Sequence, residues 1–156
     1  MSGVEGRLQS LGFELPVVAA PLAAYVPAMR SGNLIFTSGQ LPTRNGELVA
    51  AGIVGKDLTV EEAKAAAEVC ALNAIAAVKS VLGNLDNVRR VVKVVGFVAS
   101  TPEFTQQPAV VNGASELLLA VFGDIGKHAR SAVGVAALPI NAPVEVELIV
   151  EVDHMA

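Results

Sequence analysis

Two charged side chains in the last quarter of the sequence, Arg130 and Glu145, have the chemistry to act on a small molecule. A guanidinium can hold a carboxylate through two parallel charge-assisted hydrogen bonds, a geometry that lysine cannot copy. A glutamate carboxylate can activate water as a general base, or act as an acid where burial raises its pKa. The sequence therefore offers a carboxylate-binding group and an acid–base group.

Both residues lie in segments with the two-residue alternation of β-strands. From Val144 to Asp153 apolar and mostly acidic residues alternate, which indicates a sheet with one dry face and the acids on the other. In residues 129–137, Arg130, Ala132 and Gly134 share one face and the valines share the opposite one. If the valines mark the core, Arg130 stands on the non-core face, and a small molecule could lie over its small neighbours and reach the guanidinium.

Each candidate also has a purely structural interpretation. A hairpin through residues 138–143 would place Arg130 opposite Glu151, and a surface ion pair of that kind is worth under ~1 kcal/mol. Glu145 could equally be an exposed strand glutamate. The same hairpin would separate Glu145 from Arg130 by roughly 20 Å along the strands. The two could serve one small ligand only if the strands do not form a hairpin, or if a neighbouring subunit completes the site.

The remaining pattern predicts two helices and further strands in one layered domain. A capping box at Thr59–Glu62 begins a helix with an alanine-rich stripe, and Gly83 ends it. Pro108 sits in the first turn of a second helix that Gly123 ends. Strands are expected near Tyr25–Met29, at 34–37 and at 91–99, the last with its alternation partly lost, as in a strand covered on both sides. The order strand, strand, helix, strand, helix, strand, strand predicts an α+β fold, a mixed sheet with two helices on one face.

The sequence pattern predicts one domain preceded by a short N-terminal extension. Residues 1–12 are expected to form a helical extension, and residues 13–156 a single domain. Within that domain, 13–27 has three prolines and is expected to be an edge strand or an extended arm. Residues 43–57 are expected to form a loop, and a hairpin-like fold of this loop is the alternative.

Composition narrows the function classes. The 156 residues are 53% hydrophobic and 17% charged, so part of the surface is expected to be covered by other copies of the chain. A net charge of −4 argues against nucleic acid as a partner. There is no uncharged run of the ~18 residues that a membrane span needs, no export signal and a single cysteine, so a cytoplasmic protein without a membrane partner is expected.

The sequence lacks several well-known site motifs. It has no glycine-rich phosphate loop, no metal-ligand spacing and no Ser-His-Asp arrangement with a nucleophile elbow, so no metal site is expected. Cys70 falls inside the alanine stripe and is expected to be a buried core thiol. His128 is expected to cap a helix end or to line a pocket, the structural role being favoured. Asn112 is either a solvated helix residue or a polar group at the lip of a pocket.

Several motifs, taken together and in this order, resemble the RidA/YjgF family of reactive-intermediate imine deaminases. The C-terminal motif is Ala-Arg-Ser-x-Val-x-Val-x-x-Leu-Pro at 129–139 followed by Val-Glu-Val-Glu at 144–147. Three further parts of the sequence also agree with the family pattern: Tyr25 ahead of a hairpin, the run from Gly32 to Pro42, and Val111-Asn112. The similarity runs from about residue 25 to residue 152.

The resemblance implies a chorismate-mutase-like fold, assembled as a homotrimer with ligand clefts between subunits. It implies that Arg130 binds the substrate carboxylate and Glu145 positions or activates water, with the cleft lined by Tyr25, Ser38, Gly39, Asn112 and Ala132. The implied reaction is hydrolysis of 2-imino or enamine acids to 2-keto acids and ammonia, without metal or cofactor. A trimer that binds a small carboxylate-bearing metabolite without turnover is the alternative, and ribonuclease activity is a third that the acidic balance disfavours.

The sequence also departs from the family pattern near the arginine. Ala132 stands where many members have a cysteine, which excludes thiol chemistry at that place. Gly134 replaces a larger, often acidic residue, and His128-Ala129 replaces the commoner approach to Arg130. These departures indicate a divergent branch.

Overall fold

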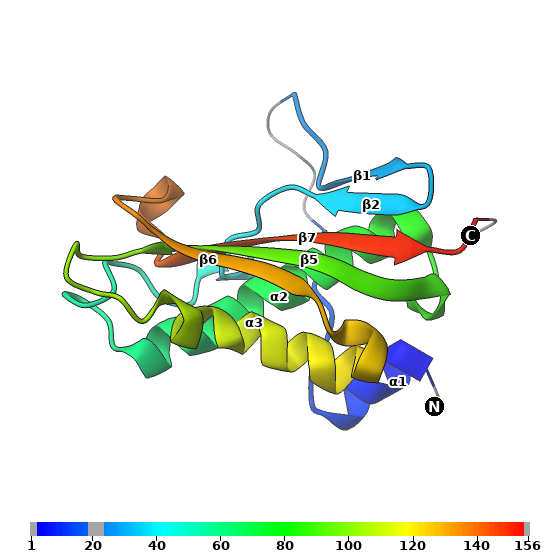
Figure 1. Cartoon of the computed structure of the whole chain (residues 1–156), viewed down its shortest axis with the longest axis horizontal. Helices are drawn as coiled ribbons and strands as arrows, with labels where there is room; N and C mark the ends of the chain where they lie inside the picture. The colour runs from blue at the N-terminus through cyan, green and yellow to red at the C-terminus, as the bar shows by residue number, and fades with distance from the viewer. Residues whose placement is uncertain (1–2, 19–23, 155–156) are drawn as a thin grey trace.

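The computed structural model describes residues 3–18 and 24–154, and it has a five-stranded mixed sheet with two long helices packed on one face (Figure 1). The strands lie in the order β1-β2-β7-β5-β6. Their bounds are β1 (Ala28–Ser31), β2 (Leu34–Thr37), β5 (Val88–Ala99), β6 (Ala129–Val135) and β7 (Val144–Val152). The covering helices are α2 (Val60–Leu82) and α3 (Gln107–Phe122). The α+β architecture predicted from the sequence is confirmed.

The helices begin and end where the local sequence requires. Thr59 Oγ1 accepts from the backbone N–H of Glu62 at 3.2 Å, and the Glu62 carboxylate accepts from the backbone N–H of Thr59 at 3.0 Å, so the capping box is formed. Gly83 follows α2 with a φ of 85°, a left-handed conformation that glycine adopts at little cost. Pro108 lies in the first turn of α3, and Gly123 follows its last residue.

The two C-terminal strands do not form the predicted hairpin. β6 pairs in parallel with β5, and β7 pairs antiparallel with β5 on the other side, so β5 lies between them. The reason is that α3 connects β5 to β6 as a crossover, which returns the chain in the same direction. The connection from β6 to β7, with its short 3₁₀ turn at Pro139–Asn141, then has to pass the end of β5.

The face of β6 that carries Arg130 is also the opposite of the one predicted. Arg130 pairs with Val94, which is fully buried under the helices, so its side chain points to the helix side of the sheet. Val133 pairs instead with Phe97 on the open face and is 44% exposed. The valines misled the prediction because the open face is apolar as well, with Val95 and Phe97 on it.

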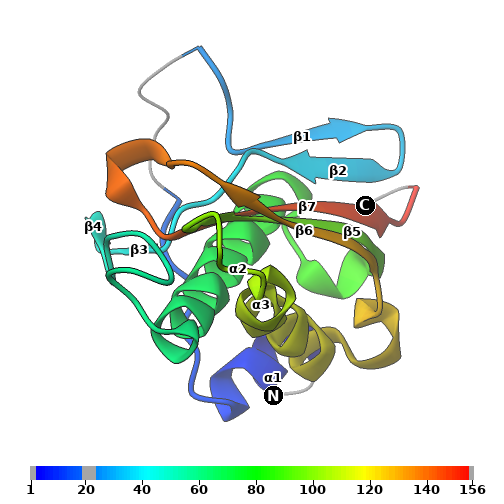
Figure 2. The same ribbon diagram turned by 60° about the vertical axis from the view of Figure 1, so that its left-hand side comes forward.

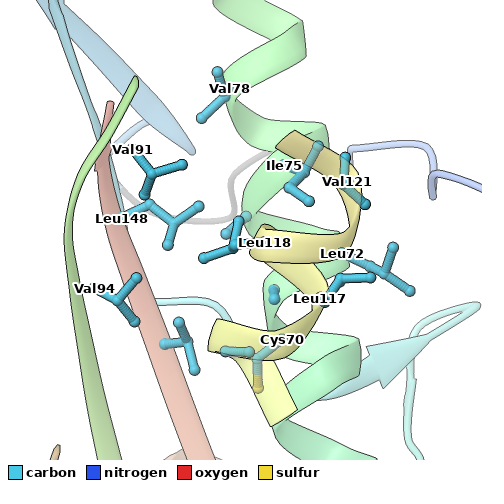
Figure 3. Packing of buried hydrophobic residues seen from close by; sticks show 14 of the residues in the cluster. Cys70, Leu72, Ile75, Val78, Val91, Val94, Leu117, Leu118, Val121 and Leu148 are labelled. Carbon is cyan, nitrogen blue, oxygen red and sulfur yellow. The ribbon is translucent and has the colours of Figure 1, made fainter. Parts of the chain in front are cut away.

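The core lies between the sheet and the two helices. Figure 3 shows Val91, Val94 and Leu148 of the sheet pointing towards Ile75 of α2 and Leu118 of α3. The helices cross closely, since a Cβ on Gly113 would lie 2.0 Å from the carbonyl oxygen of Lys64. Cys70 is buried, with Sγ 3.6 Å from the carbonyl oxygen of Val144, so the predicted core thiol is confirmed.

Strand β5 loses its alternation for a local reason. The register with β7 shifts between Val88 and Arg90 and again between Val91 and Lys93, so both Val91 and Val94 reach the core. Within the described chain the helices cover only one face of this strand. The lost alternation therefore marks bulges rather than the cover on both sides that the sequence suggested.

The N-terminal helix α1 (Gly3–Ser10) packs onto the domain beneath α3 and the 3₁₀ turn Leu85–Asn87 (Figure 2). Its Val4 and Leu8 belong to the core cluster and are almost fully buried. The division into an extension at 1–12 and a domain at 13–156 stays a prediction, but the helix shares the core of that domain.

The other irregular segments fit their predictions in part. Residues 13–18 and 24–27 belong to no helix or strand, with bends at residues 24 and 27, and residues 19–23 of the predicted arm lie outside the described residues. The loop expected at 43–57 contains a small hairpin, β3 (Thr43–Arg44) with β4 (Glu47–Leu48).

By length and composition alone, two helical segments could cross a membrane: Val60–Leu82 and Gln107–Gly126. In the domain, 67% and 50% of their most apolar windows are buried. Their apolar character is therefore accounted for largely by packing against the sheet and each other.

Candidate functional site

Arg130 reaches from β6 to the side of α3 and is held there by two acceptors. Its Nη1 donates to Asn112 Oδ1 at 2.7 Å and to Ser115 Oγ at 3.2 Å. Asn112 and Ser115 are three residues apart on α3, so they lie on the same side of the helix. The amide of Asn112, which the sequence left as solvated or at a lip, is thus a direct partner of the guanidinium.

The ion pair offered as the alternative for Arg130 does not form. Glu151 lies opposite Arg90 of β5, with 3.0 Å between Arg90 Nε and Glu151 Oε1. Within the described chain, the hydrogen bonds of Arg130 all involve Nη1. The other edge of the guanidinium, formed by Nε and Nη2, has two parallel N–H groups, the arrangement that a carboxylate can bind in bidentate fashion.

Ser115 and His128 extend the hydrogen-bonded group. Ser115 Oγ lies 2.8 Å from His128 Nε2, and His128 Nδ1 lies 2.6 Å from the carbonyl oxygen of Gly126. His128 therefore bonds to the last residue of the 3₁₀ turn Gly123–Gly126, which follows α3, rather than to the end of α3 at Gly123 where its capping role was predicted. Ser115 was missed from the sequence, although its spacing of three from Asn112 on a helix was the signal that could have found it.

Beyond Arg130 the helix-side face of β6 carries small residues. Ala132 is half-buried and packs against the core, and a Cβ on Gly134 would lie 2.8 Å from Gln107 Nε2. The Gln107 amide is fixed over the glycine, since its Nε2 donates to the carbonyl oxygen of Phe104 at 2.8 Å. The small residues predicted next to Arg130 are therefore partly covered by α3, and Gln107 closes the far end.

Glu145 lies at the start of β7 on the open face of the sheet, against the backbone of Gly39. A Cβ on Gly39 would lie 2.2 Å from Glu145 Oε2, so the absence of a side chain there makes room for the carboxylate. Burial raises the pKa of Glu145 above its ordinary value, and the nearby charge of Glu147 raises it further. Among the described residues, Glu145 thus has the environment of a group that can exchange protons with a substrate or water.

Tyr25 and Ser38 lie on the same side of the domain as Gly39. Both line an open hollow of about 480 Å³. Ser38, the residue after β2, donates from Oγ to the carbonyl oxygen of Val26 at 2.6 Å and so links the end of β2 to the segment that precedes β1. Tyr25 is 59% exposed. Gly39 and Tyr25 also border a larger cavity of about 950 Å³ between the arm and α2.

The predicted site residues therefore form two groups that one chain does not bring together. Arg130, Asn112 and Ala132 lie on the helix side of the sheet, and Glu145 lies on the open face with Gly39. β5 also separates β6 from β7, which puts about 10 Å between their backbones. The hairpin on which the predicted separation rested does not form. The two residues are instead kept apart by the opposite faces of the sheet and by the intervening strand β5.

The described residues contain no cluster of three or more His, Cys, Asp or Glu side chains that could hold a metal ion. The thiol of Cys70 is not available to either group, because it is buried, and burial raises its pKa well above the ordinary value, with the charge of Glu145 as a second cause.

Comparison with known proteins places this chain in a family. Residues 5–152 match the family described as "YjgF/chorismate mutase-like, putative endoribonuclease". The chain belongs to the YjgF/RidA family. Protein TCP17 of Trypanosoma cruzi is 49% identical over 152 residues, which are 97% of this chain and 95% of that protein.

Solved structures of YjgF/RidA members have the same fold. The protein Atu1372 of Agrobacterium tumefaciens, described as having unknown function, superposes with a TM-score of 0.90 at 54% identity, covering 96% of this chain and 93% of that one. RidA from an Antarctic Psychrobacter species superposes with a TM-score of 0.60 at 28% identity, covering 88% of this chain and 94% of that one. The YjgF/chorismate-mutase-like fold expected from the resemblance is confirmed.

Proposed function

We propose that this protein is a cytoplasmic imine deaminase that hydrolyses 2-imino or enamine acids to 2-keto acids and ammonia. The observation that carries the proposal is the state of Arg130, whose Nη1 is occupied by Asn112 and Ser115 while its Nε and Nη2 edge is left for a carboxylate. Membership of the YjgF/RidA family, to which a protein named RidA belongs, supports the same reaction.

The chemistry required of the protein is modest. With the substrate carboxylate on Arg130, Glu145 takes a proton from water as the water oxygen bonds to the carbon of the protonated imine, whose C=N π electrons move to nitrogen, which gives a neutral tetrahedral carbinolamine. Glu145 returns that proton to nitrogen, which regenerates its carboxylate and makes the nitrogen a leaving group. The C–N bond then breaks as the hydroxyl oxygen forms the carbonyl, and the hydroxyl proton goes to the departing ammonia, so the keto acid and ammonium leave. The reaction changes no oxidation state overall, and the raised pKa of Glu145 makes its carboxylate a stronger base for taking the proton from water.

The two groups of residues fit this mechanism only in an assembly, and we propose a homotrimer with its sites between subunits. In that arrangement the Arg130 group of one subunit meets the Glu145 group of the next. The open sheet face supports an assembled state, because it exposes apolar side chains that a monomer would leave in water, among them Met29, Phe36, Val95, Phe97 and Val133. Arg130 and Glu145 are thus expected to work in pairs drawn from different copies.

The reaction is tested by ammonia and pyruvate release from enzymatically generated 2-iminopropanoate. Wild-type protein should accelerate release over the spontaneous rate, and Arg130→Ala should remove the acceleration. Wild-type protein that gives only the spontaneous rate would refute deamination of this substrate. If it then still binds pyruvate through Arg130, it is a carboxylate-binding trimer without turnover, the alternative function.

The shared site is tested by mixing two inactive variants. Arg130→Ala subunits keep Glu145, and Glu145→Ala subunits keep Arg130, so a 1:1 trimer reassembled from unfolded chains should recover about a quarter of the wild-type sites. The matched control is each variant reassembled alone, which should stay inactive. Mixed trimers with no recovery would show that a single chain supplies both residues, and light scattering on the same samples measures the subunit number.

A further inference from the structure

The guanidinium of Arg130 is anchored to the backbone through two side chains that no part of the deamination mechanism uses. Ser115 Oγ accepts from Arg130 Nη1 at 3.2 Å and lies 2.8 Å from His128 Nε2. His128 Nδ1 in turn lies 2.6 Å from the carbonyl oxygen of Gly126. The chain of contacts thus runs from the ligand-binding group to a fixed carbonyl of the 3₁₀ turn that precedes β6.

The direction of each hydrogen bond follows from what each atom can do. The carbonyl of Gly126 only accepts, so Nδ1 of His128 carries a hydrogen. In the neutral form with that tautomer, Nε2 of His128 is an acceptor and takes the hydroxyl hydrogen of Ser115. The Ser115 oxygen then has its lone pairs directed at Arg130, so every group in the chain is satisfied.

The consequence for Arg130 is a fixed orientation. Nη1 carries two hydrogens, and Asn112 Oδ1 and Ser115 Oγ take one each. With one end of the planar guanidinium held at two points, its rotation is restricted and the Nε and Nη2 edge keeps one direction. A flexible arginine would lose this freedom on each binding event, which weakens binding.

We propose that Ser115 and His128 are positioning residues that pre-orient Arg130 for the substrate carboxylate. The identity of the ligand rests on the proposed function, whereas the positioning rests on the hydrogen bonds alone. His128 lies directly before β6, and its side chain and that of Arg130 both reach Ser115 of α3. Because the carboxylate is held alike in the substrate and in the transition state, loss of positioning raises KM and leaves kcat nearly unchanged.

Four variants separate positioning from general structure. Ser115→Ala removes the link, and His128→Asn keeps a group near Nδ1 but cannot reach the hydroxyl. His128→Gln places a polar group near the position of Nε2 and should restore the link. Ser80→Ala is the matched control, since Ser80 is an exposed helix serine that donates to the carbonyl of Ala77 away from both groups.

The first readout is kinetic and uses 2-iminopropanoate, with calorimetric binding of pyruvate as a probe that needs no turnover. Ser115→Ala and His128→Asn should raise KM and weaken pyruvate binding by roughly 3- to 10-fold, the range for one lost hydrogen bond. His128→Gln and Ser80→Ala should stay within about twofold of wild type. A drop confined to kcat, or equal losses in the asparagine and glutamine variants, would overturn the proposal.

The second readout needs no ligand and keeps the two proposals separate. In ¹⁵N NMR spectra, the guanidinium signals of Arg130, assigned by their loss in Arg130→Lys, should show slow rotation in wild type and faster rotation in Ser115→Ala. If wild type shows slow rotation but no deamination, the proposed function fails and the positioning role stands. If rotation is equally fast in folded wild type and Ser115→Ala, the positioning role fails whatever the enzyme activity.

Discussion

Gly39→Ala is the sharpest test of the role given to Glu145, because it moves the carboxylate without removing it. An alanine Cβ at this position would lie 2.2 Å from Oε2 and 2.7 Å from Cδ of Glu145, whereas ordinary contact begins near 3.4 Å. The carboxylate must therefore shift by roughly 1 Å, a displacement that can cost on the order of 100-fold in rate. The backbone of Gly39 is outside the left-handed region, so alanine adds no conformational strain.

The stability of the fold should change little, since the clashing atoms are the end of a half-buried side chain that can rotate away. We expect kcat/KM for 2-iminopropanoate to fall about 100-fold, while the free energy of unfolding changes by less than about 1 kcal/mol. The assay is ammonia release, with urea unfolding of the same samples.

A double-mutant cycle decides whether the effect passes through Glu145. If it does, Gly39→Ala combined with Glu145→Ala should be no slower than Glu145→Ala alone. Wild-type activity in Gly39→Ala would refute the reasoning. So would additive losses in the double variant, because they would mean that the glycine contacts something else.

Three further perturbations follow from the structure. In Glu147→Gln the acidic limb of the kcat/KM profile should move to lower pH, because the mechanism needs the Glu145 carboxylate and one of the two causes of its raised pKa is removed. Gly113→Ala should lower the free energy of unfolding by about 1–3 kcal/mol, because its Cβ would lie 2.0 Å from the carbonyl oxygen of Lys64 and force the helices apart. Thr59→Ala should lower it by about 1 kcal/mol through loss of the helix cap, measured by thermal unfolding as a fall of about 2–4 °C.

The controls for these three are simple. The control for Gly113→Ala is Ala120→Ser at an exposed position on α3, which should leave the unfolding midpoint within about 1 °C of wild type. An equally large fall in this control would show that the Gly113→Ala result does not report on the close contact between the helices. An unmoved acidic limb in Glu147→Gln would show that the charge of Glu147 does not reach Glu145. An unchanged midpoint in Thr59→Ala would mean that water replaces the cap at no cost.

The parts of the fold that depend on neighbouring residues in the chain could be predicted from the sequence. Such features act over only a few residues, and each has its expected place: the capping box at Thr59, the helix ends at Gly83 and Gly123, and the alternation in β7. The buried position of Cys70 followed from the helical period in the same way.

The pairing of distant strands could not be predicted in this way. Nothing in residues 138–143 distinguishes a hairpin from a connection that passes a third strand, so β6 was placed beside β7. The facing of β6 was wrong because a sheet with apolar residues on both faces gives valines on either side of a strand. Ser115 could have been found only through its spacing of three from Asn112, and that spacing points to Arg130 only once the strand β6 is known to face α3.

The crossover from β5 through α3 to β6 puts the whole carboxylate-binding group in one continuous stretch of about 30 residues, while the Glu145 group comes from the strand end after β2 and from β7. The two groups therefore lie in separate stretches of the sequence. A segment exchanged over residues 107–135 would carry Arg130 together with Asn112, Ser115 and His128, and would leave Gly39 and Glu145 as they were.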